Sequence, residues 1–347
     1  MFLNLKEGGK NMKEAMFYET LGEKKVKCYL CAHRCLIPEG KRGICGVREN
    51  HEGKLYSLVY NRIIAKHNDP IEKKPLYHFY PGSYSFSIAT VGCNFRCLFC
   101  QNADISQMPR DTKQILGWET TPEEVVNSAI NQGAKSISYT YTEPTIYFEF
   151  AYETACLAVK KGLKNVFVSN GYMSEEALKA IKPFLHAANI DLKSFQDRFY
   201  KEICGAKLQP VLDTITRMSK MGIWVEVTTL LIPTVNDSKE ELRDIAKWIY
   251  QLNPDIPWHI SRFYPTYRFT HVPPTGIEAV HMAREIGLEE GLHYVYTGNA
   301  PGDEGENTFC HHCGKLIIKR YGYTIITYDI IEGKCKYCGT KIPGIGM

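Results

Sequence analysis

The sequence predicts an α/β protein, built as a partial (β/α)6 barrel with a small cysteine-rich metal module at each end. Short β-rich runs alternate with amphipathic helical runs through the middle of the chain, as in parallel strands joined by crossover helices. Eleven of the 13 cysteines fall into three groups, and two of these groups lie near the chain ends. We therefore expect three parts: a cysteine-rich segment with a linker over 1–84, the barrel over 85–305 and a second module over 306–347.

Length and composition allow a large buried core, since 44% of the 347 residues are hydrophobic and 23% are charged. The net charge of +4 is too small to select nucleic acid or an anionic membrane as a partner. The first residues carry charges in place of the apolar core of a signal peptide, and the chain has no apolar run of about 18 residues. We expect a cytoplasmic protein that does not bind a membrane.

The first cysteine group is Cys28, Cys31, Cys35 and Cys45, and its spacing fits neither an ordinary zinc ribbon nor an ordinary ferredoxin. This group could bind either zinc or an iron–sulfur cluster, and uncoordinated thiols are a third alternative. The stretch 68–75 that follows has two prolines and alternating charges, which is typical of a linker.

The strands of the barrel are predicted at 85–91, 136–141, 165–169, 188–192, 224–232 and 259–263. Helical runs lie between them, at 122–132, 145–161, 174–185, 208–221 and 238–252. Thr121 before Pro122 is an N-cap followed by proline at the first helical position. About six units are fewer than the eight of a closed barrel, so we expect an open or partial barrel, with a doubly wound sheet as the alternative.

The middle cysteine group, Cys93, Cys97 and Cys100, directly follows the first barrel strand with the spacing Cys-x3-Cys-x2-Cys. Active sites of such folds form from the loops at the carboxyl ends of the strands. Three thiolates can hold an iron–sulfur cluster and leave one iron open for a further ligand. A zinc loop with its fourth ligand elsewhere is the alternative. Cys156 and Cys204 are isolated, and we expect plain thiols there.

The last cysteine group consists of two Cys-x2-Cys-Gly knuckles on either side of an alternating segment, 321–328, and its cysteines are Cys310, Cys313, Cys335 and Cys338. Paired knuckles on a hairpin predict a zinc ribbon or a rubredoxin-like site, with zinc favoured over a single iron. His311 and His312 lie between the first two ligands, and we expect them to face solvent. The basic residues of this module leave nucleic acid open as a partner.

The central motif, Cys93-x3-Cys97-x-Phe99-Cys100 after the first strand of a β/α body, resembles the signature of the radical S-adenosylmethionine (SAM) enzymes. The resemblance implies a full or partial (β/α) barrel. It also implies that these three cysteines ligate a [4Fe-4S] cluster whose open iron binds SAM, and that Phe99 packs near the adenine.

Further matches follow successive strands. The segment ending in Glu143-Pro144 resembles the Gly-Gly-Glu-Pro element that binds the SAM amino group, although Tyr141 and Thr142 replace its glycines. Ser169-Asn170-Gly171 and Asp191-Leu192-Lys193 resemble motifs of the pyruvate formate-lyase activating enzymes, which implies that Ser169, Asn170, Asp191 and Lys193 lie around the SAM ribose and carboxylate. His259 and Arg262 lie in the last strand on opposite faces, so only one should point into the barrel.

The wider arrangement, from Cys28-x2-Cys31-Ala-His-Arg-Cys35 through the stretch 67–75 to Tyr296-Thr-Gly-Asn299, resembles the radical SAM component of the AmmeMemoRadiSam system, a branch near the activating enzymes. This resemblance implies a low-potential electron donor of the flavodoxin or ferredoxin type. It also implies a protein or peptide substrate, with AMMECR-type and Memo-like proteins as candidate partners.

The function expected from these features is the reductive cleavage of SAM to a 5'-deoxyadenosyl radical, which takes a hydrogen atom from a protein or peptide. Modification of a small molecule or RNA is the alternative within the class. A non-catalytic module in which all three cysteine groups hold zinc is the alternative of another class. The electron donor, the abstracted hydrogen and the product are not specified by any motif.

Overall fold

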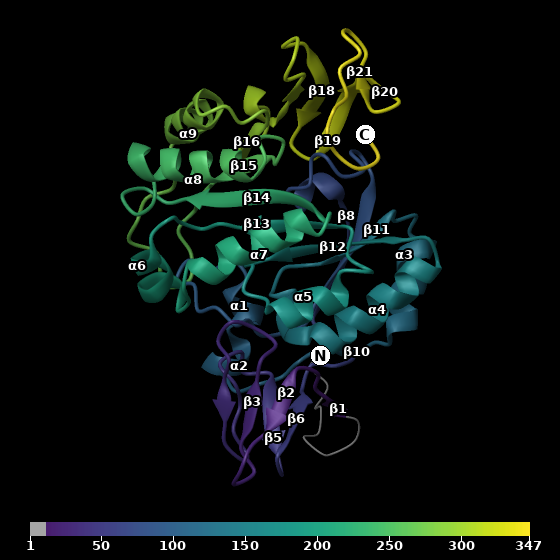
Figure 1. Ribbon diagram of the computed structural model, residues 1–347, viewed down its shortest axis with the longest axis vertical. Coiled ribbons are helices and arrows are strands. Elements are labelled where there is room, and N and C mark those ends of the chain that lie inside the picture. Colours follow the sequence, from purple (N-terminus) through teal and green to yellow (C-terminus); the bar gives the residue numbers. More distant parts are fainter. Residues whose placement is uncertain (1–11) are drawn as a thin grey trace.

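The structure is a computed structural model and describes residues 12–347. A large sheet with its helices forms the middle of the molecule (Figure 1). The N-terminal module, in purple, lies at one end of the long axis, and the C-terminal module, in yellow, lies at the other. The very first residues, on which the expectation of a chain without an export signal rests, lie outside the described part. None of the helices within residues 12–347 is long and apolar enough to cross a membrane.

The central sheet has eight strands in the order β16-β15-β14-β13-β12-β11-β9-β8. Neighbours from β9 to β16 pair in parallel, and the order runs from one edge to the other as an open barrel. The strands are β8 (Ala65–Pro70), β9 (Tyr84–Ala89), β11 (Ser136–Tyr139), β12 (Lys164–Ser169), β13 (Ala187–Asp191), β14 (Trp224–Leu231), β15 (Trp258–Arg262) and β16 (Val295–Gly298). Because both faces of these strands are covered, most of their residues are buried.

The crossover helices follow the predicted order along the chain. They are α3 (Pro122–Asn131), α4 (Phe148–Lys160), α5 (Glu175–Ile181), α7 (Gln209–Lys220), α8 (Lys239–Leu252) and α9 (Ile277–Glu289). Helix α3 begins with a capping box, in which Thr121 and Glu124 each accept a hydrogen bond from the other's backbone N–H. Ser174 and Ser238 cap α5 and α8 in the same position through their hydroxyls.

The α/β partial barrel predicted from the sequence is confirmed, and the sheet extends beyond the six predicted strands at both edges. Strand β16 adds a seventh parallel strand next to β15. Strand β8 pairs antiparallel with β9 from Ala65 to Pro70, so the first part of the expected linker is an edge strand. The 3-10 helix Ile71–Lys73 continues directly from it. The linker prediction is therefore wrong for this stretch, because Asn68, Asp69 and Pro70 pair with β9 and the buried Asp69 is bonded to the buried Lys74, as described below.

The two modules consist of short antiparallel strands. The N-terminal module contains β1 (Lys13–Glu14), β2 (Tyr18–Thr20), β3 (Val26–Cys28), β4 (Leu36–Ile37), β5 (Arg48–His51) and β6 (Lys54–Ser57), and β7 (Arg62–Ile63) pairs with β10 (Trp118–Glu119). The C-terminal module contains β17 (Thr308–Phe309), β18 (Leu316–Tyr321), β19 (Thr324–Tyr328), β20 (Ile330–Ile331) and β21 (Lys334–Cys335). Short helices α1 (Ala103–Ser106) and α2 (Met108–Asp111) follow the central cysteines, and α6 (Asp197–Phe199) follows β13.

Candidate active site

A cavity of about 880 Å³ lies at the carboxyl ends of the parallel strands. Its walls come from the loops that follow β9, β11, β12, β13 and β15, and from residues after β16. The turn between β18 and β19 adds Gly322 and Tyr323, so the C-terminal module forms part of the wall. The cavity therefore occupies the position where α/β folds of this kind bind their ligands.

Cys93, Cys97 and Cys100 all line this cavity. The loop that carries them is held by backbone hydrogen bonds to a neighbouring segment, from Arg96 N to Cys204 O at 2.8 Å and from Leu98 N to Ile203 O at 3.1 Å. Helix α2 fixes the same loop from the other side, since Arg110 donates to the carbonyl of Cys93 at 2.6 Å. Three cysteines of one short loop thus line one cavity.

The three central sulfurs do not have the spacing of a single-ion site. In residues 12–347, the one group of metal-ligating side chains with all ligand atoms within 4.8 Å of one another is elsewhere, at Cys310, Cys313, Cys335 and Cys338. The three central sulfurs are spaced more widely than one tetrahedral ion needs. Burial raises the pKa of the Cys93 thiol well above its ordinary value, so metal binding must displace a proton there.

Cys204, expected to be a plain thiol, is fully buried beside Cys97. A hydrogen bond between the two thiols and burial together raise the pKa of Cys97 well above its ordinary value. No spacing rule in the sequence connects these two cysteines, because Cys204 ends a short helical segment that follows β13, far along the chain from the cysteine loop after β9.

Glu143 joins the loops after β11 and β12. Its Oε1 accepts hydrogen bonds from Thr145 N–H at 3.0 Å and from the Ser169 hydroxyl at 2.8 Å, and its Oε2 accepts from Asn170 N–H at 2.8 Å. Burial raises the pKa of this carboxyl, although these donors favour the charged form. Oε2 faces fewer protein donors than Oε1, and Glu143 lines the cavity, so one acceptor position is available to a ligand.

Asn170 continues this connection to the cysteine loop. Its amide nitrogen donates to Asn94 Oδ1 at 2.8 Å and lies 3.8 Å from Cys93 Sγ. Asn94 follows Cys93 directly, so a polar chain runs from Glu143 through Asn170 to the cysteines. The Ser169 and Asn170 predicted from the sequence therefore meet Glu143 and Cys93 at one wall of the cavity.

Tyr141, at the position of a glycine in the family motif, has φ of 62°. This left-handed backbone conformation is strained for a residue that has a Cβ atom and is unstrained for glycine. Tyr141 therefore has a backbone conformation that favours glycine, and its carbonyl accepts a hydrogen bond from Asn102 at 2.9 Å. The side chain is held in turn, because its hydroxyl donates to Asp69.

Asp69 also binds Lys74, whose Nζ lies 2.6 Å from its Oδ2. Lys74 and Tyr141 both line the cavity, and the ammonium lies 4.6 Å from the centre of the tyrosine ring. Burial lowers the pKa of Lys74 to about 8, although Asp69 opposes this shift. Sequence reasoning missed this group because its charges resembled those of an exposed linker.

Asp191 ends β13 and Lys193 follows it, and the two are paired, with 2.8 Å between Lys193 Nζ and Asp191 Oδ2. Burial disfavours the ammonium, but Asp191 and the nearby thiols hold the pKa of Lys193 well above its ordinary value. The ammonium also lies 5.7 Å from the centre of the Phe99 ring. Phe99 and both charged residues line the cavity.

His259 and Arg262 diverge as strand alternation requires. His259 lines the cavity and its Nε2 lies 2.7 Å from Glu226 Oε2, whereas Arg262 donates to the carbonyl of Thr275 at 2.9 Å. Glu226 is a fully buried carboxylate that also accepts from the backbone N–H groups of Tyr77 and His78. It went unnoticed in the sequence because it lies in an otherwise apolar strand.

The four cysteines of the C-terminal module form a compact site. The sulfurs of Cys310 and Cys338 are 3.7 Å apart, and those of Cys313 and Cys335 are 3.8 Å apart. A tetrahedral ion with metal–sulfur bonds of about 2.3 Å places its sulfurs about 3.8 Å apart, so these four cysteines fit one metal ion.

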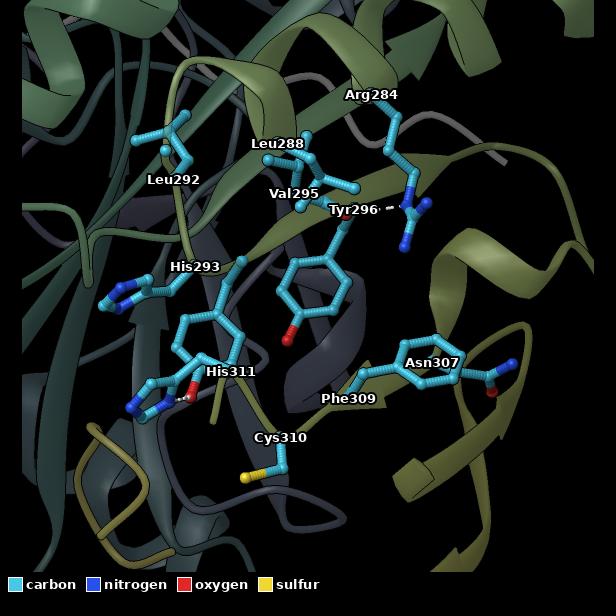
Figure 2. Close-up of a pocket in the computed structure, with 12 residues that line it drawn as sticks. Arg284, Leu288, Leu292, His293, Val295, Tyr296, Asn307, Phe309, Cys310 and His311 are labelled. Carbon is cyan, nitrogen blue, oxygen red and sulfur yellow. Dashed lines mark hydrogen bonds between the residues drawn. The ribbon is translucent and has the colours of Figure 1, made fainter. Parts of the chain in front are cut away.

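His311 takes no part in this group. Figure 2 shows it beside Cys310, in a smaller cavity between the barrel and the C-terminal module. Its ring stacks on His293 with 4.6 Å between centres, and its Nδ1 lies 2.8 Å from the Tyr294 hydroxyl. The histidine is therefore in contact with the barrel and not with the metal site.

The N-terminal cysteines lie in the module that packs against the central cysteine loop. Cys28 and Cys45 are buried, and Cys31 and Cys35 are partly exposed. These four sulfurs also fall outside the 4.8 Å spacing of a single-ion site within the described part of the chain.

Comparisons with known proteins agree with this geometry. The family model described as Radical SAM superfamily matches residues 87–249, from β9 into α8. An uncharacterized protein of Methanocaldococcus jannaschii is 51% identical over 334 residues, which cover 95% of this chain and 99% of the relative. A pyruvate formate-lyase-activating enzyme of Clostridium pasteurianum is 26% identical over 167 residues, 46% of this chain and 66% of that protein.

Among solved structures, Streptococcus suis SuiB bound to S-adenosylmethionine is similar with a TM-score of 0.50 and 11% identity. The similarity covers 70% of this chain and 58% of SuiB. At this identity the likeness concerns the fold, which agrees with the open parallel barrel described above.

Proposed function

The chain belongs to the radical SAM superfamily and is an enzyme of that class, and we propose that it takes a hydrogen atom from a protein or peptide substrate. The observation that carries this proposal is the convergence of Cys93, Cys97 and Cys100 on one large cavity at the strand ends. In this proposal the three cysteines hold a [4Fe-4S] cluster and the cavity holds SAM next to it. When bound, these two groups supply the reductive cleavage of SAM to a 5'-deoxyadenosyl radical.

In this proposal the residues of the chain bind SAM and orient it in the cavity. We assign Phe99 to the adenine, and Ser169, Asn170, Asp191 and Lys193 to the ribose and carboxylate side of SAM. Glu143 contributes its freer oxygen to an ammonium group and holds the loop of Ser169 and Asn170 in place. These groups also replace water around the reacting atoms, which protects a reactive intermediate from side reactions.

His259 is the residue of the last strand that we assign to the cavity, and Arg262 is not, because its guanidinium is bonded to Thr275 outside the cavity lining. Glu226 fixes the orientation of the His259 ring through the contact at Nε2. We name no general acid or base, because the proposed chemistry requires none at the first step.

A protein or peptide substrate is supported by the similarity to an enzyme named for activating pyruvate formate-lyase. The size of the cavity and the half-exposed Tyr323 at its wall also suit a polypeptide segment that enters from the surface. By the resemblance noted above, AMMECR-type and Memo-like proteins are the candidate partners, and a flavodoxin- or ferredoxin-type protein is the electron donor.

The alternative within the class, modification of RNA or a small molecule, has one supporting feature. The C-terminal module combines lysines with exposed Tyr321, Tyr323 and Tyr337, and aromatic and basic groups together can bind single-stranded nucleic acid. A purely zinc-binding, non-catalytic chain is ruled out by its membership of an enzyme superfamily. For the C-terminal cysteines we propose structural zinc.

The test measures 5'-deoxyadenosine released from SAM by the anaerobically reconstituted, reduced protein. We expect release by the wild type and its loss, by at least 100-fold, in Cys97→Ala. Cys156→Ala is the matched control, because Cys156 lies on α4 away from the cavity and its variant should keep full activity. Equal release by the wild type and Cys97→Ala would disprove the assignment of the cluster. The substrate is then sought by deuterium transfer into 5'-deoxyadenosine from candidate proteins.

A further inference from the structure

The four N-terminal cysteines are gathered around one point of the module although they span residues 28–45. Cys28 N–H donates to the carbonyl of Cys35 at 2.9 Å, which places the end of β3 next to the residue that precedes β4. A side-chain carbon at Gly43 would lie 3.8 Å from Cys35 Sγ, so the loop that leads to Cys45 passes directly over Cys35. Cys31 lies in the turn between Cys28 and Cys35.

The spacing of these sulfurs can be compared with that of the C-terminal and the central cysteines of the same chain. The C-terminal cysteines have the separations of 3.7 and 3.8 Å that a single tetrahedral ion requires. The central cysteines, which belong to the cluster motif, do not reach such spacing, and within residues 12–347 the N-terminal four do not reach it either. In spacing, the N-terminal set therefore differs from the single-ion site, as the central set does.

A buried arginine shows that the centre is built for negative charge. Arg48 is 1% exposed, and its Nη1 donates to Cys28 Sγ at 3.7 Å. Its Nη2 pairs with Glu149 and donates to the carbonyl of Met16 at 2.9 Å, while its Nε has no hydrogen-bond partner in the structure. A guanidinium directed at a thiol in the protein interior favours a thiolate, as in a ligated sulfur, over an uncoordinated thiol.

The same module is bonded to the central cysteine loop. His33, between Cys31 and Cys35, has its Nε2 2.8 Å from the carbonyl of Asn94. Arg110 donates both to the carbonyl of Ile44 at 3.0 Å and to that of Cys93 at 2.6 Å. The two cysteine loops are therefore neighbours in space, joined by direct hydrogen bonds.

We propose that Cys28, Cys31, Cys35 and Cys45 bind an iron–sulfur cluster next to the central site. Four thiolates leave no iron open for a substrate, so the site suits electron transfer. In this role the cluster accepts one electron from a low-potential ferredoxin- or flavodoxin-type donor and is oxidised again when the electron passes on toward the neighbouring loop. This inference goes beyond the proposed function and does not depend on SAM cleavage.

The test counts metal and sulfide in the full chain with Cys93→Ala, Cys97→Ala and Cys100→Ala combined, after anaerobic reconstitution with iron and sulfide. We expect about two to four iron with an equal amount of acid-labile sulfide, about one zinc, and an electron paramagnetic resonance signal after dithionite reduction. Two zinc ions without sulfide, or no metal beyond the C-terminal site, would overturn the proposal. The assay contains no SAM and does not measure SAM cleavage. A negative result would therefore contradict the N-terminal cluster without contradicting the proposed function.

A second set of variants in the same background assigns the ligands. Cys31→Ser should remove the remaining sulfide and leave zinc unchanged, whereas the matched Cys313→Ser should remove zinc and leave sulfide unchanged. Sulfide that persists in Cys31→Ser and also in Cys35→Ser would contradict the assignment. If either serine variant fails to fold, the metal and sulfide content of the triple variant decides the question without it.

Discussion

The carboxylate of Glu143 and the backbone N–H of Asn170 are joined by a 2.8 Å hydrogen bond between the loops that follow two neighbouring strands. Asn170 in turn contacts Asn94 and lies near Cys93. One carboxylate thus fixes the position of the loop that approaches the central cysteines, and it does so from inside the protein.

Glu143→Gln should weaken SAM binding at least 10-fold, because an amide has one acceptor oxygen and its NH2 would face a backbone N–H. An unsatisfied buried group of this kind costs about 1–3 kcal/mol of stability. SAM affinity by calorimetry and the free energy of unfolding by denaturant titration check both effects. Thr145→Val, which removes one hydroxyl donor to the same carboxylate at a residue outside the cavity lining, is the control and should lose less of each. Unchanged affinity in Glu143→Gln would contradict the role of this contact.

The effect of a substitution at Tyr141 on SAM affinity should depend more on whether the new residue tolerates the left-handed backbone conformation than on the size of its side chain. Its φ of 62° is free for glycine and strained for a β-branched residue by about 1–2 kcal/mol. We expect Tyr141→Gly to keep SAM affinity within about threefold and Tyr141→Val to lose at least 10-fold. Equilibrium binding of SAM to both reconstituted variants gives the answer, and equal affinities would show that the left-handed backbone is not required.

His78 should make the protein less stable in acid. Burial lowers its pKa to about 4, with Arg320 adding to the shift and Glu226 opposing it, while the unfolded chain has a pKa of about 6.5. Between these values the unfolded state binds more protons, so stability falls by up to about 3 kcal/mol as the pH drops from 6.5 to 4.

The contacts of His78 can be made by a neutral ring, which has one nitrogen that donates and one that accepts. One nitrogen lies 2.7 Å from the Tyr296 hydroxyl, and the other lies 2.7 Å from the carbonyl of Pro343. Urea unfolding at several pH values should show a smaller loss in acid for His78→Gln than for the wild type. His312→Gln, at an exposed position, should behave as the wild type. An identical pH dependence in His78→Gln would refute the assignment.

Removing a ligand of the C-terminal metal should lower the zinc content of the protein without changing its iron content. Cys313→Ser is expected to remove about one zinc per chain and to lower the melting temperature by several degrees, because a structural zinc site contributes folding free energy. Metal analysis and calorimetry of the full chain measure both, with Cys156→Ser as the control. A drop in iron without a drop in zinc would identify a rubredoxin-like site in its place.

The sequence predicted those parts of the protein whose signals are local. The strand before Cys93 and the N-cap at Thr121 have short patterns that tertiary structure does not override. Strand β8 was missed because its charged residues and Pro70 resemble a linker, although an edge strand tolerates proline and its Asp69 is paired with Lys74.

The parts of the site that escaped prediction depend on contacts between distant segments. Glu226 meets His259 only because their strands are neighbours in the sheet, and Cys204 meets Cys97 only because a helical segment crosses the cysteine loop. Tyr141 shows a third case, in which a residue other than glycine has the left-handed backbone conformation that favours glycine. Residue identity alone cannot reveal that conformation.

Gly322 and Tyr323 belong to a hairpin that is anchored by four thiols and yet form part of the wall of the catalytic cavity. If these thiols hold the zinc proposed for them, the shape of the cavity wall depends on a metal bound outside the cavity. In that case a cell short of zinc would contain chains with a complete barrel but an altered wall, so metal supply would change which substrates reach the site before it changed the chemistry.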